Sequence, residues 1–258
     1  MPVFNGMPYI KLAVKSILEQ TYKNTELIII DDASTDLTWK YLKSLKDKRI
    51  VLLKNQTTLG IATSLNKGLK KSKGLYIARM DAYHISNPSR LEKQLKYLQK
   101  NPKVDLCGTW VDLIDQAGKK VGEKKFPTSP SQVKKSISWY AAVIHPTYMG
   151  KKSFFQGLNG YRQKYELAED YDLLSRAKNK YIIANIPLKL LLWRLNPKRS
   201  SRTNMRKMDK IDLMIKRDAL KRDGYSLTGL LAFSKKALMT YVIPFSLKFK
   251  LATKLKQA

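Results

Sequence analysis

The sequence has little cysteine, little histidine and few acidic residues. Its 258 residues include one cysteine, Cys107, and two histidines. A single cysteine excludes a disulfide framework and a cysteine-based zinc site, and it fits a reducing compartment. No run reaches the ~20 apolar residues that a membrane-spanning helix needs. The nearest stretch, ALMTYVIPFSL at 237–247, is short and contains Pro244.

The scarcity of acidic residues gives the chain a large positive charge. There are 50 lysines and arginines against 20 acidic residues, a net charge of +30. Such a charge points to nucleic acid, an anionic membrane surface or phosphorylated small molecules as partners. Residues 197–258 carry 16 basic and 4 acidic residues, so this segment is about twice as basic per residue as the rest.

The composition is that of a globular protein. Hydrophobic residues make up 43% and charged residues 27%, which excludes wholesale disorder. A chain of this length forms one large domain, or one domain with an appendage.

Helical and strand-like patterns alternate over the first 110 residues. Apolar strand-like runs lie at 26–30, 50–53 and 75–78, between helical patterns at 5–18, 35–45, 63–69 and 88–99. This alternation predicts βαβ units and a parallel sheet. Later segments predict a strand at 104–115, a hairpin at 117–125, a helix from about 169, a buried apolar stretch at 182–193 and basic helices after Pro197.

Acidic residues follow two of the predicted strands. Asp31 and Asp32 come after the strand at 26–30, and Asp81 follows the next-but-one strand. Ligands of open α/β sheets bind at the carboxyl ends of the strands, so these residues are candidates for a site. Aspartates at strand ends also cap turns, and that structural interpretation stays open.

The motifs around these residues resemble family 2 glycosyltransferases of the GT-A fold. They are PVFNG, LEQTYKNTELIIIDDASTD, LGIATSLNKGL, GLYIARMDA and HPTYMGKKSFFQGLNGYRQKYELAEDYDLLSRA. The resemblance runs from residue 2 to about 203. It implies an α/β GT-A nucleotide-diphospho-sugar transferase fold at 1–203, with a Rossmann-like, mostly parallel sheet flanked by helices. A nucleotide-binding half would span 1–110, an acceptor half 111–203, and a basic helical region 204–258.

The resemblance also implies an activity and the residues for it. Such enzymes transfer a sugar from a nucleotide diphosphate to an acceptor hydroxyl with inversion, using a general base and often a divalent metal. Asp170 and Glu169 match the catalytic motif, with Asp170 the expected base. Asp81 and His84 would hold Mn²⁺ or Mg²⁺. The expected nucleotide-sugar-binding residues are Pro2, Phe4, Asn5, Asp32, Asn66, Arg79, Asp81 and Arg194.

The sequence departs from the family pattern at the metal element. The family usually has DADD, whereas this chain has Asp81, Ala82, Tyr83 and His84. A tyrosine phenol is a poor ligand for Mg²⁺ or Mn²⁺. Three interpretations stay open: His84 replaces the carboxylate, the site works with weak or no metal binding, or catalysis is lost.

Two further departures lie elsewhere. The family has a strand before PVFN, but Met1 directly precedes Pro2, so we expect that the natural start lies upstream and that neighbouring strands have unpaired backbone groups. Near residue 194 the family often has Tyr-Arg-x-His. This chain keeps Arg194, which faces either the diphosphate or solvent. His145 also matches the family and lies either near the acceptor or metal, or in a structural position.

The basic C-terminal region predicts a surface contact. Residues 225–258 carry six lysines and no acidic residue, interleaved with apolar residues. This mixture is typical of a segment in an anionic membrane interface; a solvated helix packing on the domain is the alternative. No nucleic acid is expected, because no recognition motif accompanies the charge.

The predicted function is sugar transfer to a glycan or polyprenyl-linked acceptor in cell-surface polysaccharide biosynthesis. The expected location is the cytoplasm, peripheral on the inner face of the membrane. The alternative is a catalytically impaired nucleotide-sugar-binding protein, which the altered pair Tyr83 and His84 motivates.

Overall fold

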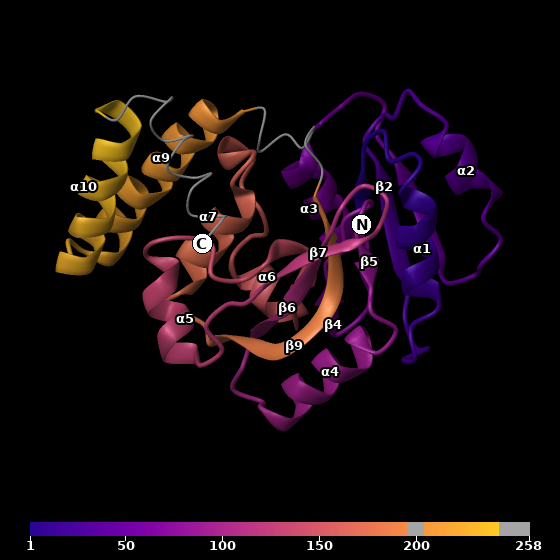
Figure 1. Ribbon diagram of the computed structural model, residues 1–258, viewed down its shortest axis with the longest axis horizontal. Coiled ribbons are helices and arrows are strands. Elements are labelled where there is room, and N and C mark those ends of the chain that lie inside the picture. The colour runs from indigo at the N-terminus through magenta and orange to yellow at the C-terminus, as the bar shows by residue number, and fades with distance from the viewer. Residues whose placement is uncertain (196–203, 243–258) are drawn as a thin grey trace. The chain divides into compact units, whose positions relative to one another are not determined.

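The computed structural model describes residues 1–195 and 204–242, which belong to two compact units. The first unit ends at Pro197, and the second begins at Lys198. Figure 1 shows the elements of both units in chain order.

Three parallel strands form the first sheet, in the order β1-β2-β3. These strands are β1 (Pro2–Val3), β2 (Leu27–Asp31) and β3 (Ile50–Lys54). The helices between and after them are α1 (Ile10–Leu18), α2 (Thr38–Ser44) and α3 (Ile61–Lys71). The parallel βαβ arrangement predicted from the apolar periodicity is confirmed for this part of the chain.

The core beneath the first sheet explains why α1 forms where it does. Its apolar residues recur at helical spacing, and Ile10, Ala13, Val14 and Ile17 are buried. They pack in one cluster with Ile29 of β2.

The second sheet is mixed rather than mostly parallel. Its order is β4-β8-β6-β9-β5, with β7 paired to β6. Only β6 and β9 pair in parallel; the other pairs are antiparallel. The strands are β4 (Tyr76–Ala78), β5 (Ile85–Ser86), β6 (Leu106–Ile114), β7 (Lys120–Lys124), β8 (Met149–Lys151) and β9 (Ile183–Arg194).

Four further α-helices and two short 3₁₀ turns complete the described part of the first unit. They are α4 (Arg90–Lys100), α5 (Pro130–Ile137), η1 (His145–Thr147), α6 (Lys152–Gly157), η2 (Gln163–Tyr165) and α7 (Glu169–Ala177). Helix α4 packs against β6, β8 and β9. The helix predicted from about residue 169 is therefore confirmed as α7.

The two sheets share no paired strand within the described residues. A cavity of about 870 Å³ is lined by Ile28 and Ile30 of β2, by Ile77 of β4 and by Met1. The amino group of Met1 donates to the Ile28 carbonyl over 2.8 Å. Strand β1, which follows Met1, contributes only two residues to the first sheet.

The second unit contains a helical pair in its described residues. Helix α9 (Met205–Asp223) packs against α10 (Leu227–Tyr241), and Gly224, with φ of +83°, ends α9. The Ser226 hydroxyl caps α10 by accepting from the Gly229 amide. No helix of the described residues is long and apolar enough to cross a membrane.

Candidate active site

The loop after β1 and the turn after β2 are fastened together by Asn5. Its side-chain oxygen accepts from the Thr35 backbone amide over 2.8 Å, and its backbone amide donates to the Ser34 hydroxyl over 2.9 Å. Pro2 is buried in β1, whereas Phe4 is half exposed. Of the predicted nucleotide-binding residues in this loop, Phe4 thus presents a surface on which a base can stack.

Asp32 fixes the segment that leads into α3. Its carboxylate accepts from the Leu59 and Gly60 amides, both over 2.9 Å, and from the Asn55 side chain over 2.6 Å. Asp32 is buried, at 5% exposed. The predicted ligand-binding carboxylate is therefore occupied by the protein's own donors.

Asn66 of α3 is also bonded within the protein. Its side chain accepts from the Tyr161 amide over 2.8 Å and donates to the Tyr161 carbonyl over 2.7 Å. The preceding Gly160 has φ of +63°, and a Cβ there would collide with the Asn66 amide oxygen. Asn66 therefore holds residues 160–161 against α3.

Glu166 caps the same helix, although no pattern in the sequence indicates this contact. Its carboxylate accepts from the Ile61 amide over 2.7 Å and the Ala62 amide over 3.3 Å. An anion at a helix N-terminus is stabilised by the orphan amides and the macrodipole. The capping residue lies over a hundred positions away in the chain, so no local capping motif marks it.

Arg79, Asp81 and His84 form a buried cluster. An Arg79 Nη lies 2.7 Å from an Asp81 oxygen, and His84 Nε2 lies 3.3 Å from the other. Burial raises the pKa of Asp81, but the Arg79 charge and His84 outweigh it and hold this pKa well below its usual range. Arg79 Nε and one Nη have no hydrogen-bond partner among the described residues.

Arg194 supports this cluster from β9. Its amide donates to His84 Nδ1 over 3.1 Å, which leaves Nε2 as the protonated nitrogen facing Asp81. The Arg194 guanidinium donates to the carbonyls of Tyr83, Asp115 and Gln116, and it is buried. Arg194, expected beside the diphosphate or in solvent, is thus bonded to backbone.

The arrangement of Asp81 and His84 does not fit a divalent cation. Each Asp81 oxygen faces a cationic or N–H group, and Tyr83 stands where the family has a carboxylate. Within residues 1–195 and 204–242, no group of three or more His, Cys, Asp or Glu could hold a metal. Magnesium and manganese prefer several oxygen ligands, so the geometry argues against the predicted metal assignment.

Glu169 and Asp170 begin helix α7, where their environments differ. Glu169 is 5% exposed, and its Oε1 lies 3.8 Å from His145 Nδ1. Burial, with the Asp170 charge second, raises the pKa of Glu169 to about 8. Asp170 is only half-buried. At neutral pH Glu169 therefore keeps its proton, and Asp170 is the more accessible of the two.

His145 links the acidic pair to Tyr161. Its Nε2 lies 3.0 Å from the Tyr161 hydroxyl, and its ring packs edge-on against Tyr148 at 4.9 Å. His145 is 6% exposed and lies beside Glu169, so whether it has a role at the acceptor or a structural role stays a prediction. Because Tyr161 is also the residue that Asn66 holds, this contact joins α3 to the acidic pair.

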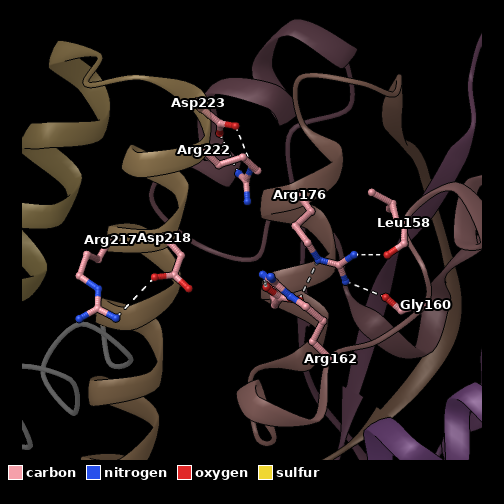
Figure 2. Close-up of polar contacts among 9 residues, drawn as sticks. Leu158, Gly160, Arg162, Arg176, Arg217, Asp218, Arg222 and Asp223 are labelled. Atoms are coloured by element: carbon pink, nitrogen blue, oxygen red, sulfur yellow. Dashed lines mark hydrogen bonds and ion pairs between the residues drawn. The ribbon is translucent and has the colours of Figure 1, made fainter.

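An arginine pair anchors the first turn of α7. Asp172 is fully buried and accepts from Arg162 and Arg176, each with an Nε contact of 3.0 Å. Figure 2 shows the Arg176 guanidinium reaching the carbonyls of Leu158 and Gly160. The spacing of Asp172 and Arg176, four residues apart on one helix, is the sequence signal for this ion pair.

The two buried clusters are connected through Tyr161 and His145. Arg79 and Tyr161 line the same cavity, the Tyr161 hydroxyl lies 3.0 Å from His145 Nε2, and His145 Nδ1 lies 3.8 Å from Glu169. The structure therefore brings Arg79 and the Glu169–Asp170 pair into one neighbourhood. The Asn5 loop is connected separately, to residues 34–36.

A family model described as "Glycosyl transferase family 2" matches residues 1–166. The chain belongs to this family. An uncharacterized glycosyltransferase of Haemophilus influenzae is 33% identical over 83% of this chain and 70% of its own length. The Bacillus subtilis putative glycosyltransferase EpsE is 36% identical over 68% of this chain and 64% of its own length.

Another relative is named for its pathway. The Escherichia coli O-antigen biosynthesis glycosyltransferase WbnJ is 34% identical over 70% of each chain. This chain thus spans about two thirds of the length of these three curated relatives.

Solved structures confirm the α/β fold as that of GT-A enzymes. S. aureus TarS 1–349 with UDP-GlcNAc has a TM-score of 0.72 at 15% identity, covering 99% of this chain and 75% of TarS. The Pyrobaculum calidifontis mannosyltransferase PcManGT, in complex with GDP-Man and Mn²⁺, has a TM-score of 0.65 at 18% identity. It covers 100% of this chain and 78% of its own.

Proposed function

We propose that this chain is an inverting glycosyltransferase that moves a sugar, of hexose type, from a nucleotide diphosphate to an acceptor hydroxyl. The observation that carries the proposal is the position of two adjacent carboxyl groups at the start of α7, with Glu169 buried and Asp170 half-buried. Two carboxyl groups in different environments are a common arrangement in acid–base catalysis. The family membership supports the same activity.

In this proposal Asp170 takes the proton of the acceptor hydroxyl as the oxygen attacks the anomeric carbon. Glu169 stays protonated at neutral pH, so it adds no second negative charge beside the base. Asp172, Arg162 and Arg176 hold the first turn of α7 in place for this step. A base positioned in this way contributes about 10²- to 10⁴-fold to the rate.

The donor is held in the N-terminal half. The ring of Phe4 gives the nucleobase of the donor a surface to stack on. The loops held by Asn5, Asp32 and Asn66 shape the site around the donor. No step is assigned to a divalent cation, because the Asp81 carboxylate is paired with Arg79. We assign Arg79, with its two remaining donors, as the cation that meets the charge developing on the diphosphate.

The acceptor is a glycan or a lipid-linked saccharide of cell-surface polysaccharide biosynthesis, and the setting is the inner face of the cell membrane. The name of the relative WbnJ supports this class of acceptor. The large positive charge supports it as well, since both the donor and polyprenyl-phosphate carriers are anionic.

The experiment is a transfer assay combined with nucleotide binding. UDP-, GDP- and dTDP-sugars are offered to the wild type and to Asp170→Asn, and product is followed by mass spectrometry. Turnover in the variant should fall at least ~100-fold with nucleotide binding retained. Asp223→Asn, in the second unit, is the matched control and should stay active. Unchanged turnover in Asp170→Asn would refute the assignment of the base.

A second candidate function is nucleotide-sugar binding without transfer. The observation in its favour is the replacement of the family's acidic pair by Tyr83 and His84, which removes the expected metal ligands. Saturable binding of one nucleotide with no turnover of any of its sugars would establish it. Tight binding of nucleic acid with no binding of nucleotides would overturn both candidates.

A further inference from the structure

Helix α10 presents an apolar surface to solvent. The exposed residues of this helix and of its C-cap include four leucines and two further apolar residues, with 39% to 74% of each side chain exposed: Leu227, Leu230, Leu231, Leu238, Tyr241 and the cap residue Val242. At 100° per residue these positions fall on one side of the helix, with Ser234 among them and Lys235 at the edge. We call these six apolar residues the α10 outer face.

The opposite side of α10 packs on α9, and it is the side that carries a paired charge. Ala232 is buried there, and Lys236 is 20% exposed. The Lys236 ammonium lies 2.9 Å from Asp209 and 2.8 Å from Asp212, both on α9. A helix in a water-soluble helical pair usually buries its leucines and exposes its lysines. In α10 the leucines of the outer face are exposed, and Lys236 lies on the side that packs against α9.

Six exposed apolar residues on one side of a helix mark an interaction site, because monomeric proteins seldom expose a large apolar patch without a function. Its occupant must tolerate the charge around it. Helix α10 has no acidic residue, and residues 225–258 carry six lysines. The sequence after α10 continues the same mixture, with Phe245, Phe249 and Leu251 among lysines.

The acidic residues of α9 offset only part of this charge, because residues 197–258 carry 16 basic residues against 4 acidic ones. Each has a basic side chain within ion-pair distance: Asp209 and Asp212 contact Lys236, Asp218 contacts Arg217, and Asp223 contacts Arg222. Figure 2 shows the last two pairs. The surface of the unit is thus positive overall, and an anionic partner is attracted to it.

A second copy of the chain is a poorer occupant. It brings another net charge of +30, so pairing two outer faces places like charges side by side. An anionic bilayer instead offers acyl chains to the leucines and phosphate groups to the lysines.

We propose that the α10 outer face binds the surface of a bilayer that contains anionic lipid, lying in the interface without crossing it. The leucines enter the boundary between headgroups and acyl chains, and Lys235 stays at the level of the phosphates. This binding does not depend on the transferase activity, so it is tested without a donor or an acceptor.

The test is co-sedimentation of the full chain with vesicles. The two vesicle types are pure phosphatidylcholine and phosphatidylcholine with 30 mol% phosphatidylglycerol. The wild type should bind the anionic vesicles at least ~10-fold more strongly than the neutral ones. Leu231→Gln combined with Leu238→Gln should weaken binding to the anionic vesicles ~10-fold or more, because the free energy gained by moving each leucine side chain from water into the apolar interface is lost. Glutamine keeps helix propensity, so the helix itself is retained.

A matched pair controls for the loss of exposed leucines in general. Leu75→Gln with Leu188→Gln removes two exposed leucines from the first unit and should leave vesicle binding unchanged. Circular dichroism checks that all variants are folded. Equal binding of wild type and the α10 variant would overturn the proposal, as would equal binding to both vesicle types.

The competing occupant is distinguished by sedimentation equilibrium without lipid. If the wild type dimerises and Leu231→Gln/Leu238→Gln is monomeric, a second copy covers the outer face and the lipid proposal is wrong. A wild type that is monomeric without lipid and bound to anionic vesicles supports it.

Discussion

Replacing Glu169 by glutamine should change how the stability of the protein depends on pH. In the folded state burial raises the pKa of Glu169 to about 8, from an ordinary value of 4.5. Between these two values the unfolded chain has released this proton and the folded chain still holds it. The free energy of unfolding therefore falls as the pH rises through this window.

The slope from one such group is about 1.4 kcal/mol per pH unit. From pH 5 to 7.5 the loss is on the order of 3 kcal/mol. Glutamine does not titrate, so Glu169→Gln should gain stability relative to the wild type over this range. Other groups also titrate over this range, so the difference between the variant and the wild type is the informative quantity.

The assay is urea unfolding followed by circular dichroism at pH 5.0, 6.0 and 7.5. The free energy of the variant minus that of the wild type should rise steadily across the three pH values. Glu19→Gln is the matched control at the exposed C-cap of α1, and its difference from the wild type should stay nearly constant. Parallel curves for Glu169→Gln and the wild type would refute the assignment of a protonated, buried Glu169.

Three further predictions concern contacts within the site. Asp172→Asn leaves two guanidinium groups without their carboxylate and should lower the free energy of unfolding, measured in urea, by about 3 kcal/mol. Asp223→Asn is the control and should change this free energy little. Equal losses in the two variants would contradict the anchoring role of Asp172. Asn66→Ala removes both bonds to Tyr161 and should cost about 1–3 kcal/mol in the same assay, a cost that an unchanged unfolding midpoint would exclude. Thermal shifts with a bound nucleotide should be equal in Mn²⁺ and in EDTA; a shift seen only with Mn²⁺ would restore Asp81 as a metal ligand.

The secondary structure of the N-terminal half could be predicted because its periodicity is strong. The strand expected at 26–30 is β2 at 27–31, and the helix expected at 88–99 is α4 at 90–100. In contrast, β8 and α5 were not predicted. Strand β8 has three residues, too few for an alternation to be visible. Helix α5 lies in a lysine- and serine-rich stretch whose helical pattern depends on Val133 and Ile137 alone.

The positions of the site residues could be predicted, but their partners could not. Asp32 and Asp81 follow strands, as expected from the sequence. The groups that bond Asp32 lie 23 to 28 residues further along the chain. Local patterns carry no information about such contacts, since they arise only when helices and strands pack. Whether these residues bind the donor stays a prediction, as does a natural start upstream of Met1.

Our proposals use positive charge in two ways, for binding a lipid surface through α10 and for binding the donor diphosphate through Arg79. These two kinds of binding should respond differently to salt. In vesicle binding by the α10 outer face, the charge comes from the exposed Lys235, whose interactions are screened beyond about 8 Å at 0.15 M salt and about 3 Å at 1 M. Arg79, assigned to the diphosphate, is 5% exposed and is screened much less. Raising the salt from 0.1 to 0.5 M should therefore release the protein from anionic vesicles while nucleotide affinity changes only a few-fold. If nucleotide binding declined as steeply as vesicle binding, the donor would be held by surface lysines, and the role given to Arg79 would be wrong.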